Sequence, residues 1–210
     1  MHFIDRQDAA GQLAKALRGY GGGGVIYALP RGGVILGAEI AKVLGIPLDL
    51  VITRKIGHPL NPEYAVCAVT EDGSLVCNET EKESLNPGWL ERAVARERAE
   101  AKRRRKLYLS QRPHIPATGK TAILVDDGIA TGLTLRAAIQ SVRNERAQKV
   151  VVAVPVAPHD VLETLRLEAD TVVVLEDDYN YLGAVGAYYT HFPQVSDEEV
   201  LDLLSRGNKP

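Results

Sequence analysis

Two adjacent carboxylates open a loop of small residues in the stretch Val125-Asp126-Asp127-Gly128-Ile129-Ala130-Thr131-Gly132-Leu133-Thr134. Residues 121–125 form a short apolar run with strong β-propensity, which predicts a strand. After the loop, apolar residues recur at helical spacing, at Leu135, Ala138, Ile139 and Val142. The loop is therefore expected at the carboxyl end of a strand and at the amino end of a helix.

The chemistry of this loop suits a phosphorylated sugar. Unpaired backbone N–H groups and the positive end of the helix dipole favour a dianionic phosphate at a helix N-terminus. Gly128 and Gly132 allow a tight turn and a close approach of the anion to the backbone. Because adjacent carboxylates repel each other, Asp126 and Asp127 are expected to meet solvent, sugar hydroxyls or a cation.

Apolar strand-like runs alternate with helical patterns along most of the chain. This alternation is typical of α/β proteins in which helices cover both faces of a mostly parallel sheet, and we predict that fold class. Strands are predicted at 25–29, 48–53, 121–125, 149–156 and 171–175, and helices at 34–44, 161–167 and after a capping box at Ser196 and Glu199.

A hairpin is predicted where Asp72-Gly73 separates two strand-like runs, because this dipeptide favours a tight two-residue turn. Cys67 and Cys77 lie in those runs, and no metal-ligand pattern surrounds them. They are the only 2 cysteines of the chain, so a reduced, structural pair is favoured over a disulfide or a zinc site.

A long helix is predicted to begin at Asn86-Pro87, a cap followed by a favoured first position. It would form a helical insertion at about 84–116. From Glu91 to Lys106 there are eight basic and three acidic residues. Such a face could bind RNA. The charges are also spaced for intrahelical pairs such as Glu100 with Arg104, and we favour a solvated helix over the site.

Composition indicates one compact unit. With 210 residues, 45% hydrophobic content and a net charge of -2, the chain can bury one sizeable core, so a single domain is expected over 1–210. No apolar run approaches the roughly 20 residues of a membrane span, and the amino terminus does not resemble a signal peptide. A cytoplasmic protein without membrane contact is expected, and the mildly acidic total gives no general case for nucleic-acid binding.

Two further loops combine cations with glycine. Leu29-Pro30-Arg31-Gly32-Gly33 lies between a predicted strand and a helix, as the acidic loop does, so both are expected at the same end of the sheet. Alone it is more often a surface turn, but its cation and backbone donors suit an anion. The stretch Thr53-Arg54-Lys55-Ile56-Gly57-His58-Pro59-Leu60-Asn61-Pro62-Glu63 predicts an exposed loop. Its Arg54, Lys55 and His58 are candidate functional groups or merely solvated side chains.

The order of apolar strand, two acidic residues and a loop ending in Thr-Gly-x-Thr resembles the phosphoribosyl-pyrophosphate motif of the type I phosphoribosyltransferases. A plain strand-to-helix turn would account for one Asp and one Gly, but not for the whole order. The resemblance implies that fold, with a hood, and implies that Asp126 and Asp127 hold the ribose hydroxyls. It also implies that a cradle holds the 5′-phosphate, formed by Ala130, Thr131, Gly132, Leu133 and Thr134.

The other two loops acquire roles by the same resemblance. Arg31, Gly32 and Gly33 would bind pyrophosphate, next to a peptide bond that is often cis in relatives. Arg54 and Lys55 would lie on a mobile catalytic loop that excludes water. Magnesium is the implied cofactor; it would arrive with phosphoribosyl pyrophosphate and reach the two aspartates through water. Relatives are commonly dimers, so a homodimer is expected.

Two positions depart from well-studied relatives. Ala130 stands where the 6-oxopurine enzymes have an Asp, which makes hypoxanthine or guanine a poor acceptor. Leu133 stands where many relatives have Gly or Ala, and its side chain could crowd the phosphate. The acceptor base is therefore open, although the hood could come from the 84–116 insertion or from the carboxyl end. Tyrosines there could stack on a base or pack in the core, namely Tyr179, Tyr181, Tyr188 and Tyr189.

The resemblance implies transfer of a 5-phosphoribosyl group from phosphoribosyl pyrophosphate to a nitrogen acceptor, with a nucleobase as the expected acceptor and with release of pyrophosphate. Three alternatives stay open: a regulatory protein that senses phosphoribosyl pyrophosphate and binds RNA, a hydrolase or phosphotransferase acting on another sugar phosphate, and a pure binding module. The regulatory RNA-binding protein is the main alternative to the transferase, although RNA contact by the basic helix is less favoured than a solvated face, because charge runs usually mark solvated faces.

Overall fold

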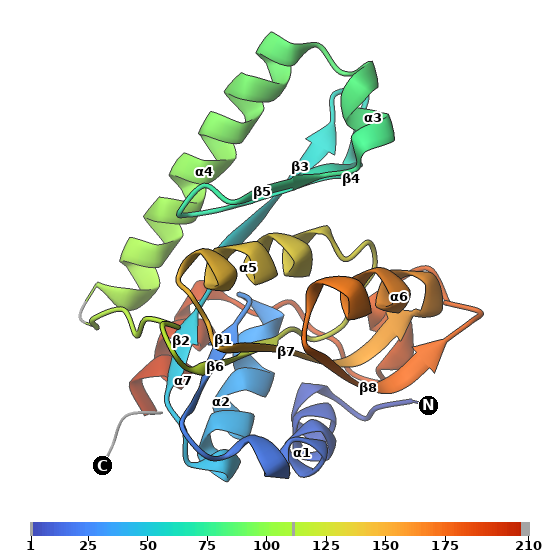
Figure 1. Ribbon diagram of the computed structural model, residues 1–210. Helices are drawn as coiled ribbons and strands as arrows, with labels where there is room; N and C mark the ends of the chain where they lie inside the picture. The colour runs from blue at the N-terminus through green and yellow to red at the C-terminus, as the bar shows by residue number, and fades with distance from the viewer. Residues whose placement is uncertain (1, 111, 207–210) are drawn as a thin grey trace.

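Five parallel strands form the central sheet of the computed structural model, which describes residues 2–110 and 112–206 (Figure 1). The order across the sheet is β2-β1-β6-β7-β8. The strands are β1 (Gly24–Ala28), β2 (Leu48–Leu50), β6 (Thr121–Val125), β7 (Lys149–Pro158) and β8 (Thr171–Asp178). The predicted α/β fold with a mostly parallel sheet is confirmed. β2 is shorter than predicted because the chain leaves the sheet after Leu50.

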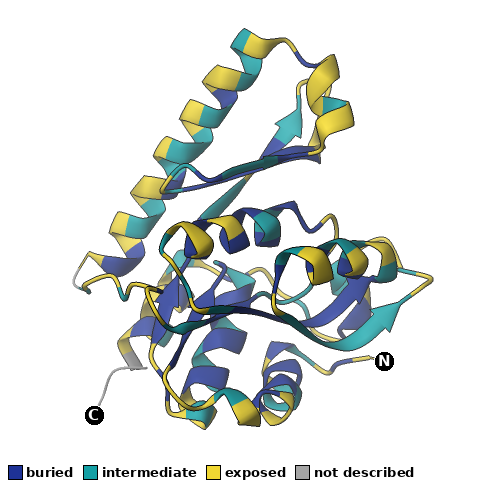
Figure 2. Cartoon of the chain, viewed as in Figure 1, coloured by how far each residue is buried: buried dark blue, intermediate teal, exposed yellow. Residues whose placement is uncertain are grey.

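Helices cover both faces of this sheet (Figure 1). One face carries α1 (Arg6–Ala16), α2 (Gly32–Leu44) and α7 (Asp197–Arg206), and the other carries α5 (Leu133–Asn144) and α6 (His159–Glu168). Alternate strand residues supply the two cores: Ile26 and Ile123 pack with the first group of helices, and Tyr27 and Leu124 with the second. Burial on both faces explains why β1, β6 and β7 are predominantly apolar. Figure 2 shows these strands as largely buried, whereas the edge strand β8 is intermediate and ends in acidic residues. Two short 3₁₀ turns complete this part, η1 (Arg18–Tyr20) and η2 (Val185–Tyr188).

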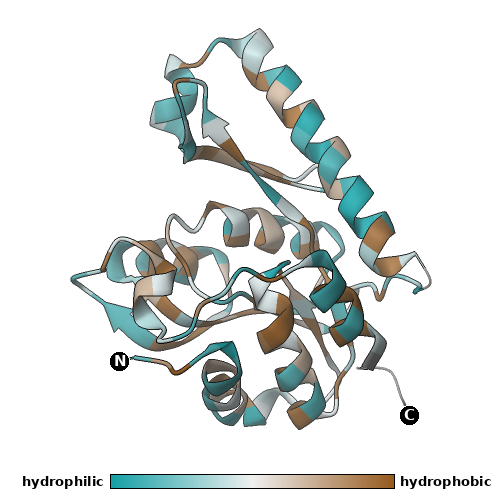
Figure 3. Cartoon of the chain, turned by 180° about the vertical axis from the view of Figure 1, so that it is seen from behind, coloured by the Kyte–Doolittle hydropathy of each residue, from teal (hydrophilic) through white to brown (hydrophobic). Residues whose placement is uncertain are grey.

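A second unit projects from the sheet between β2 and β6 (Figure 1), and we call residues 53–109 the arm. It contains an antiparallel sheet in the order β3-β4-β5, backed by two helices. Its elements are β3 (Thr53–His58), β4 (Asn61–Thr70), β5 (Leu75–Cys77), α3 (Glu79–Ser84) and α4 (Pro87–Leu109). Hydrophilic residues predominate along α4 (Figure 3). A small apolar core, including Ile56, Val66 and Ala93, holds α4 against the strands.

The predicted element boundaries are confirmed at several caps. The Asn86 side chain accepts a hydrogen bond from the backbone N–H of Trp89, with Pro87 in the first turn of α4. The backbone N–H of Glu199 donates to the Ser196 hydroxyl at 3.1 Å, and the Glu199 carboxylate accepts from the Ser196 N–H in return, as a capping box requires. Among the described helices, none is both long and apolar enough to cross a membrane.

The stretch 53–63, predicted as an exposed loop, is instead most of a β-hairpin formed by β3 and β4. Its register shifts on both sides of Gly57, which is a bulge. A side chain at Gly57 would place its Cβ 2.0 Å from the Pro62 carbonyl oxygen, so only glycine fits there. The glycine and the prolines that suggested a broken loop therefore accommodate an irregular strand pairing.

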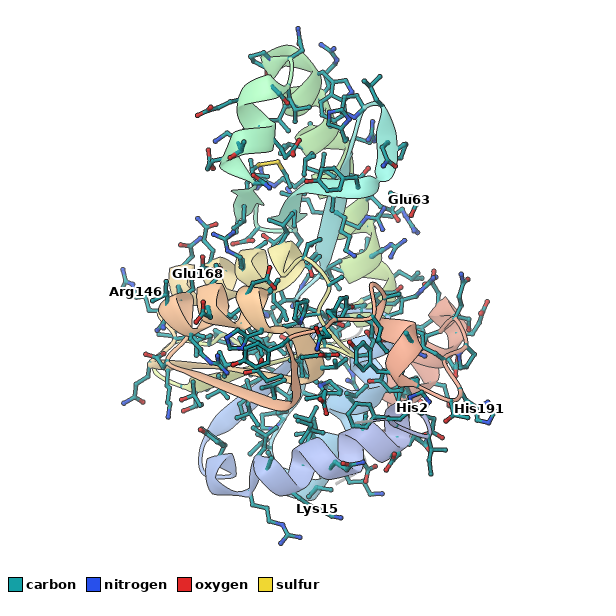
Figure 4. The ribbon with its side chains drawn as sticks, turned by 90° about the vertical axis from the view of Figure 1, so that its right-hand side faces the viewer. His2, Lys15, Glu63, Arg146, Glu168 and His191 are labelled. Carbon is teal, nitrogen blue, oxygen red and sulfur yellow. A yellow bond between two sulfur atoms is a disulfide. The ribbon has the colours of Figure 1, made fainter. Side chains whose placement is uncertain are left out.

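The expectation of reduced cysteines was wrong, because Cys67 and Cys77 form a disulfide between β4 and β5 (Figure 4). The loop of this hairpin has three residues, Glu71-Asp72-Gly73, and not the predicted two, because the Thr70 N–H donates to the Ser74 carbonyl at 3.0 Å. This register places Cys67 directly opposite Cys77, with their Cα atoms 4.0 Å apart. A two-residue turn at Asp72-Gly73 would have paired Cys67 with Asn78, so the predicted turn did not indicate the disulfide.

Native protein should therefore show no thiol reactive toward a disulfide-exchange reagent, and two after reduction and unfolding. In a loop-entropy estimate, closing a loop of sequence separation 10 stabilises the fold by about 3 kcal/mol. We expect the Cys67→Ala, Cys77→Ala variant to lose protection from hydrogen exchange mainly in the arm, with the central sheet unchanged. Equal loss of protection in both parts would contradict the separate core of the arm.

Candidate functional site

The loops that follow β1 and β6 lie side by side at the carboxyl end of the sheet. The register pairs Ala28 with Val125, the last residues of the two strands. The Leu29 N–H donates to the Val125 carbonyl at 2.9 Å, which extends the pairing by one step. The two loops predicted to lie together are therefore adjacent, as expected where neighbouring parallel strands end.

A cavity of about 390 Å³ opens over these two loops and is covered on one side by the arm. Apolar groups from the C-terminal segment, Val185 and Phe192, complete its wall. Most of the predicted site residues line it: Arg31, Gly32, Arg54, Lys55, Asp126, Asp127, Ala130, Thr131, Gly132 and Thr134. The structure thus brings residues from three separate stretches of sequence to one place.

The two carboxylates at the floor of the cavity are largely enclosed. One oxygen of Asp126, Oδ1, accepts a hydrogen bond from the Asp127 N–H at 2.9 Å. Burial raises the pKa of Asp126 well above its ordinary value, and the neighbouring Asp127 charge raises that pKa further. Burial also raises the pKa of Asp127, while the guanidinium of Arg6 opposes this shift. The pair therefore favours a proton or a positively charged ligand.

Arg6 is a site residue that the sequence analysis missed. Its Nε donates to Asp127 Oδ2 at 2.7 Å, and the Arg6 side chain is 8% exposed. Its Nη1 donates to the Pro193 carbonyl at 2.7 Å, and its guanidinium lies 3.7 Å from the centre of the Phe192 ring. Arg6 precedes its partner by 121 positions, so no local pattern could have found it.

The C-terminal segment also reaches the acidic loop through a tyrosine. The Tyr189 hydroxyl donates to the Asp127 carbonyl at 2.6 Å. Tyr188 and Tyr181 stack on each other, and Tyr179 stacks on His159. None of these four tyrosines lines the cavity. Their predicted alternative role in packing therefore fits Tyr188 and Tyr189, which are buried.

Gly33 permits the close approach between the start of α2 and the acidic loop. A Cβ at Gly33 would lie 2.7 Å from the Val125 carbonyl oxygen and 3.0 Å from the Asp126 Cα. A Cβ at Gly32 would lie 1.8 Å from Asp127 Oδ2. The peptide bond between Pro30 and Arg31 is cis. The two glycines thus allow the loop of residues 29–33 to lie directly against the two aspartates.

The small-residue loop ends at Gly132, the N-cap of α5, and no side chain caps this helix among the described residues. The N–H groups of the first helical turn are therefore available to an anion. Leu133 does not crowd this position, because its side chain is only 5% exposed and packs with Ala65, Ala68 and Ala137. Leu133 thus packs the start of α5 against β4 of the arm.

The basic side chains around the cavity differ in their partners. Arg54 pairs with Glu97 of α4 at 3.0 Å, and Arg31 lies 3.6 Å from Asp197. Lys55 is exposed and lines the cavity. His58 accepts a hydrogen bond from the Leu60 N–H at the hairpin turn and does not line the cavity.

Replacement of the two aspartates should change stability by different amounts. Because the folded-state pKa of Asp126 is raised, its contribution to the unfolding free energy is fully present below its ordinary pKa and is lost as pH rises through the raised value. Asp126→Asn removes this cost at pH 7 and should raise Tm by about 2–4 °C for each kcal/mol gained. Asp127→Asn removes a smaller cost, because the Arg6 guanidinium already offsets part of the burial of Asp127, and it leaves the buried Arg6 without its carboxylate. We therefore expect a smaller gain in Tm than for Asp126→Asn.

Thermal unfolding without ligand measures both effects, and a loss of stability in Asp126→Asn would contradict the assigned cost of burial. The same scan at a lower pH should show a smaller gain for Asp126→Asn, because the raised pKa lets more of the wild-type carboxyl be protonated there.

Gly33→Ala should destabilise the protein by about 1–3 kcal/mol, because two backbones must separate to admit the methyl group. Gly11→Ala in α1 is the matched control. A Cβ at that position meets no atom within 4 Å, and alanine favours a helix over glycine. Denaturant unfolding of both variants tests this prediction. Equal stability of the two variants would refute the close approach.

Comparison with known proteins agrees with this geometry. The profile of the phosphoribosyl transferase domain matches residues 5–189, which include both loops and Arg6. Two proteins of Mycobacterium tuberculosis, from strains CDC 1551 and H37Rv and each named "Putative phosphoribosyl transferase", are 41% identical over 210 residues. These matches cover 99% of this chain and 47% of each relative, so the chain spans about half of their length.

A solved structure has the same architecture over nearly its whole length. The crystal structure of TT1426 from Thermus thermophilus is 42% identical and superposes with a TM-score of 0.83. The match covers 98% of this chain and 99% of that chain, which includes the arm. On the domain match and on these relatives, the chain belongs to the phosphoribosyl transferase family.

Proposed function

We propose that the protein transfers a 5-phosphoribosyl group from phosphoribosyl pyrophosphate to a nitrogen atom of a nucleobase and releases pyrophosphate. The observation that carries this proposal is the meeting of two largely enclosed carboxylates with an uncapped helix N-terminus in one cavity. A phosphorylated sugar needs both: acceptors for its hydroxyls and donors for its phosphate. The family membership of the chain agrees with this assignment.

In this proposal each part of phosphoribosyl pyrophosphate is bound by a different group of site residues. Asp126 and Asp127 accept hydrogen bonds from the ribose 2′ and 3′ hydroxyls. The 5′-phosphate is held by Thr131 and Thr134 hydroxyls and by the first N–H groups of α5. The N–H groups of 32–33 and the Arg31 guanidinium hold the pyrophosphate.

Magnesium fits this residue set as a ligand shared with the substrate. Two adjacent carboxylates suit a cation that keeps several water or phosphate ligands, as magnesium does. Among the described residues, no group of three or more His, Cys, Asp or Glu is placed to hold a metal alone. When bound, the ion would offset charge on the departing pyrophosphate. Asp126 and Asp127 would reach it directly or through water.

The chemical step is a displacement at C1′ of the ribose. The acceptor nitrogen forms a bond to C1′ while the C1′–O bond to pyrophosphate breaks. Arg54 and Lys55 lie on β3 of the arm beside the cavity and would neutralise the developing charge. The arm covers the cavity on one side, which would limit attack by water. Ala130 supplies no carboxylate toward the acceptor, so 6-oxopurines are not the favoured bases.

The charge pattern of α4 supports this function over RNA binding. Arg103 and Arg104 both pair with Glu100. The Arg105 guanidinium is held by Glu71 at 2.8 Å and by the Leu50 carbonyl. These three arginines therefore have protein partners and do not form a free basic surface.

Calorimetric titration with phosphoribosyl pyrophosphate, with and without magnesium, tests the proposal. We expect magnesium-dependent binding that the Asp126→Asn, Asp127→Asn double variant loses while it still folds by circular dichroism. Glu83→Gln, an exposed carboxylate of α3, is the control and should bind as wild type. Unchanged affinity in the double variant would refute the assignment of the two aspartates.

The wild-type complex is then offered a panel of nucleobases, and pyrophosphate release is measured. Release with one base only would establish the transferase and its acceptor. Release without any base would indicate a hydrolase instead.

A further inference from the structure

Arg104 of α4 reaches the cavity, although its sequence context is a run of solvated charges. The side chain is 22% exposed and lines the same cavity as Asp126 and Lys55. Its neighbour Arg103 is 58% exposed and does not line that cavity. Two adjacent arginines of one helix therefore lie in different environments.

The two arginines also use Glu100 differently. Arg103 donates to both oxygens of Glu100, from Nε at 2.7 Å and from Nη2 at 3.0 Å, so it is held in a bidentate pair. Arg104 donates only from Nε, at 2.9 Å. Within the described part of the chain, neither of its two terminal nitrogens is seen to donate a hydrogen bond. Arg103 and then Arg104 lower the pKa of Glu100 to about 2, so this carboxylate stays ionised and holds Arg104 in place at neutral pH.

The position of Arg104 relates it to the loop that contains Arg31. One helical turn further along α4, the Tyr108 hydroxyl donates to Asp197 at 2.5 Å, and Arg31 lies 3.6 Å from the same carboxylate. The Tyr108 hydrogen bond lowers the pKa of Asp197, and the charges of Arg31 and Arg104 lower it further. Arg31 and Arg104 thus lie near one carboxylate, and both line the cavity together with Gly32.

We propose that Arg104 binds the pyrophosphate group of the substrate with the two terminal nitrogens of its guanidinium. This inference rests on the proposed function and adds to it a binding residue from the helix of the arm. A guanidinium with a free fork matches two phosphate oxygens, and its Nε bond to Glu100 fixes its orientation before the ligand arrives. The arm then contributes to the site from two elements, β3 and α4.

The test compares Arg104→Gln with Arg103→Gln in the full chain, with magnesium present. The ligands are phosphoribosyl pyrophosphate, inorganic pyrophosphate and ribose 5-phosphate, which lacks the pyrophosphate group. Loss of a hydrogen bond to a charged group corresponds to a change in Kd of roughly tenfold to a hundredfold. We expect that loss in Arg104→Gln for the two pyrophosphate-containing ligands, with ribose 5-phosphate unchanged. Arg103→Gln should bind all three as wild type.

Three outcomes would overturn the inference. They are equal affinities of the two variants for pyrophosphate, an equal loss of ribose 5-phosphate binding in Arg104→Gln, and no binding of pyrophosphate by wild type. The second outcome would mean that Arg104 supports the fold of the site. Wild type that binds inorganic pyrophosphate but not phosphoribosyl pyrophosphate would refute the proposed function, while the contrast between the variants would still decide the role of Arg104.

Discussion

The ion pair between Arg6 and Asp127 is the interaction on which the site depends. Two neighbouring carboxylates are held in a largely enclosed position, where each raises the cost of ionising the other. The guanidinium of Arg6 offsets part of that cost, and it is itself placed by Phe192 and by the Pro193 carbonyl. The first helix and the C-terminal segment therefore meet at the acidic loop. The position of the carboxylates therefore depends on contacts from both α1 and the C-terminal segment.

The negative charge of Asp126 and Asp127 that Arg6 does not offset affects both the stability of the protein and the ligands that the cavity can bind. A free site that favours a proton or a cation is less stable at neutral pH than a neutral equivalent would be. The same imbalance favours a positively charged ligand at the carboxylates. Sites that bind charged ligands commonly carry such a cost in the free protein.

The arm is tied to the site at two places, and both are made by side chains. Leu133 packs between the first turn of α5 and the alanines of β4. Tyr108 of α4 donates to Asp197 at the start of α7, close to Arg31. A change in the position of the arm would therefore alter the contacts of Leu133 and Asp197. The disulfide lies in the sheet that packs against α4, and Cys77 lines a pocket together with Leu133.

The sequence by itself determined the local elements: the parallel strands, the helix caps, the hairpin at Asp72-Gly73 and the order of the acidic loop. These depend on residues within a few positions of each other, so periodicity and turn chemistry predict them. The irregular pairing around Gly57, the disulfide, the burial of Leu133, the Arg6 partner of Asp127 and the different environments of Arg103 and Arg104 were decided only by the tertiary structure. Each of them depends on contact between segments that are far apart in the sequence, and a local sequence pattern does not indicate which distant segment a residue will contact.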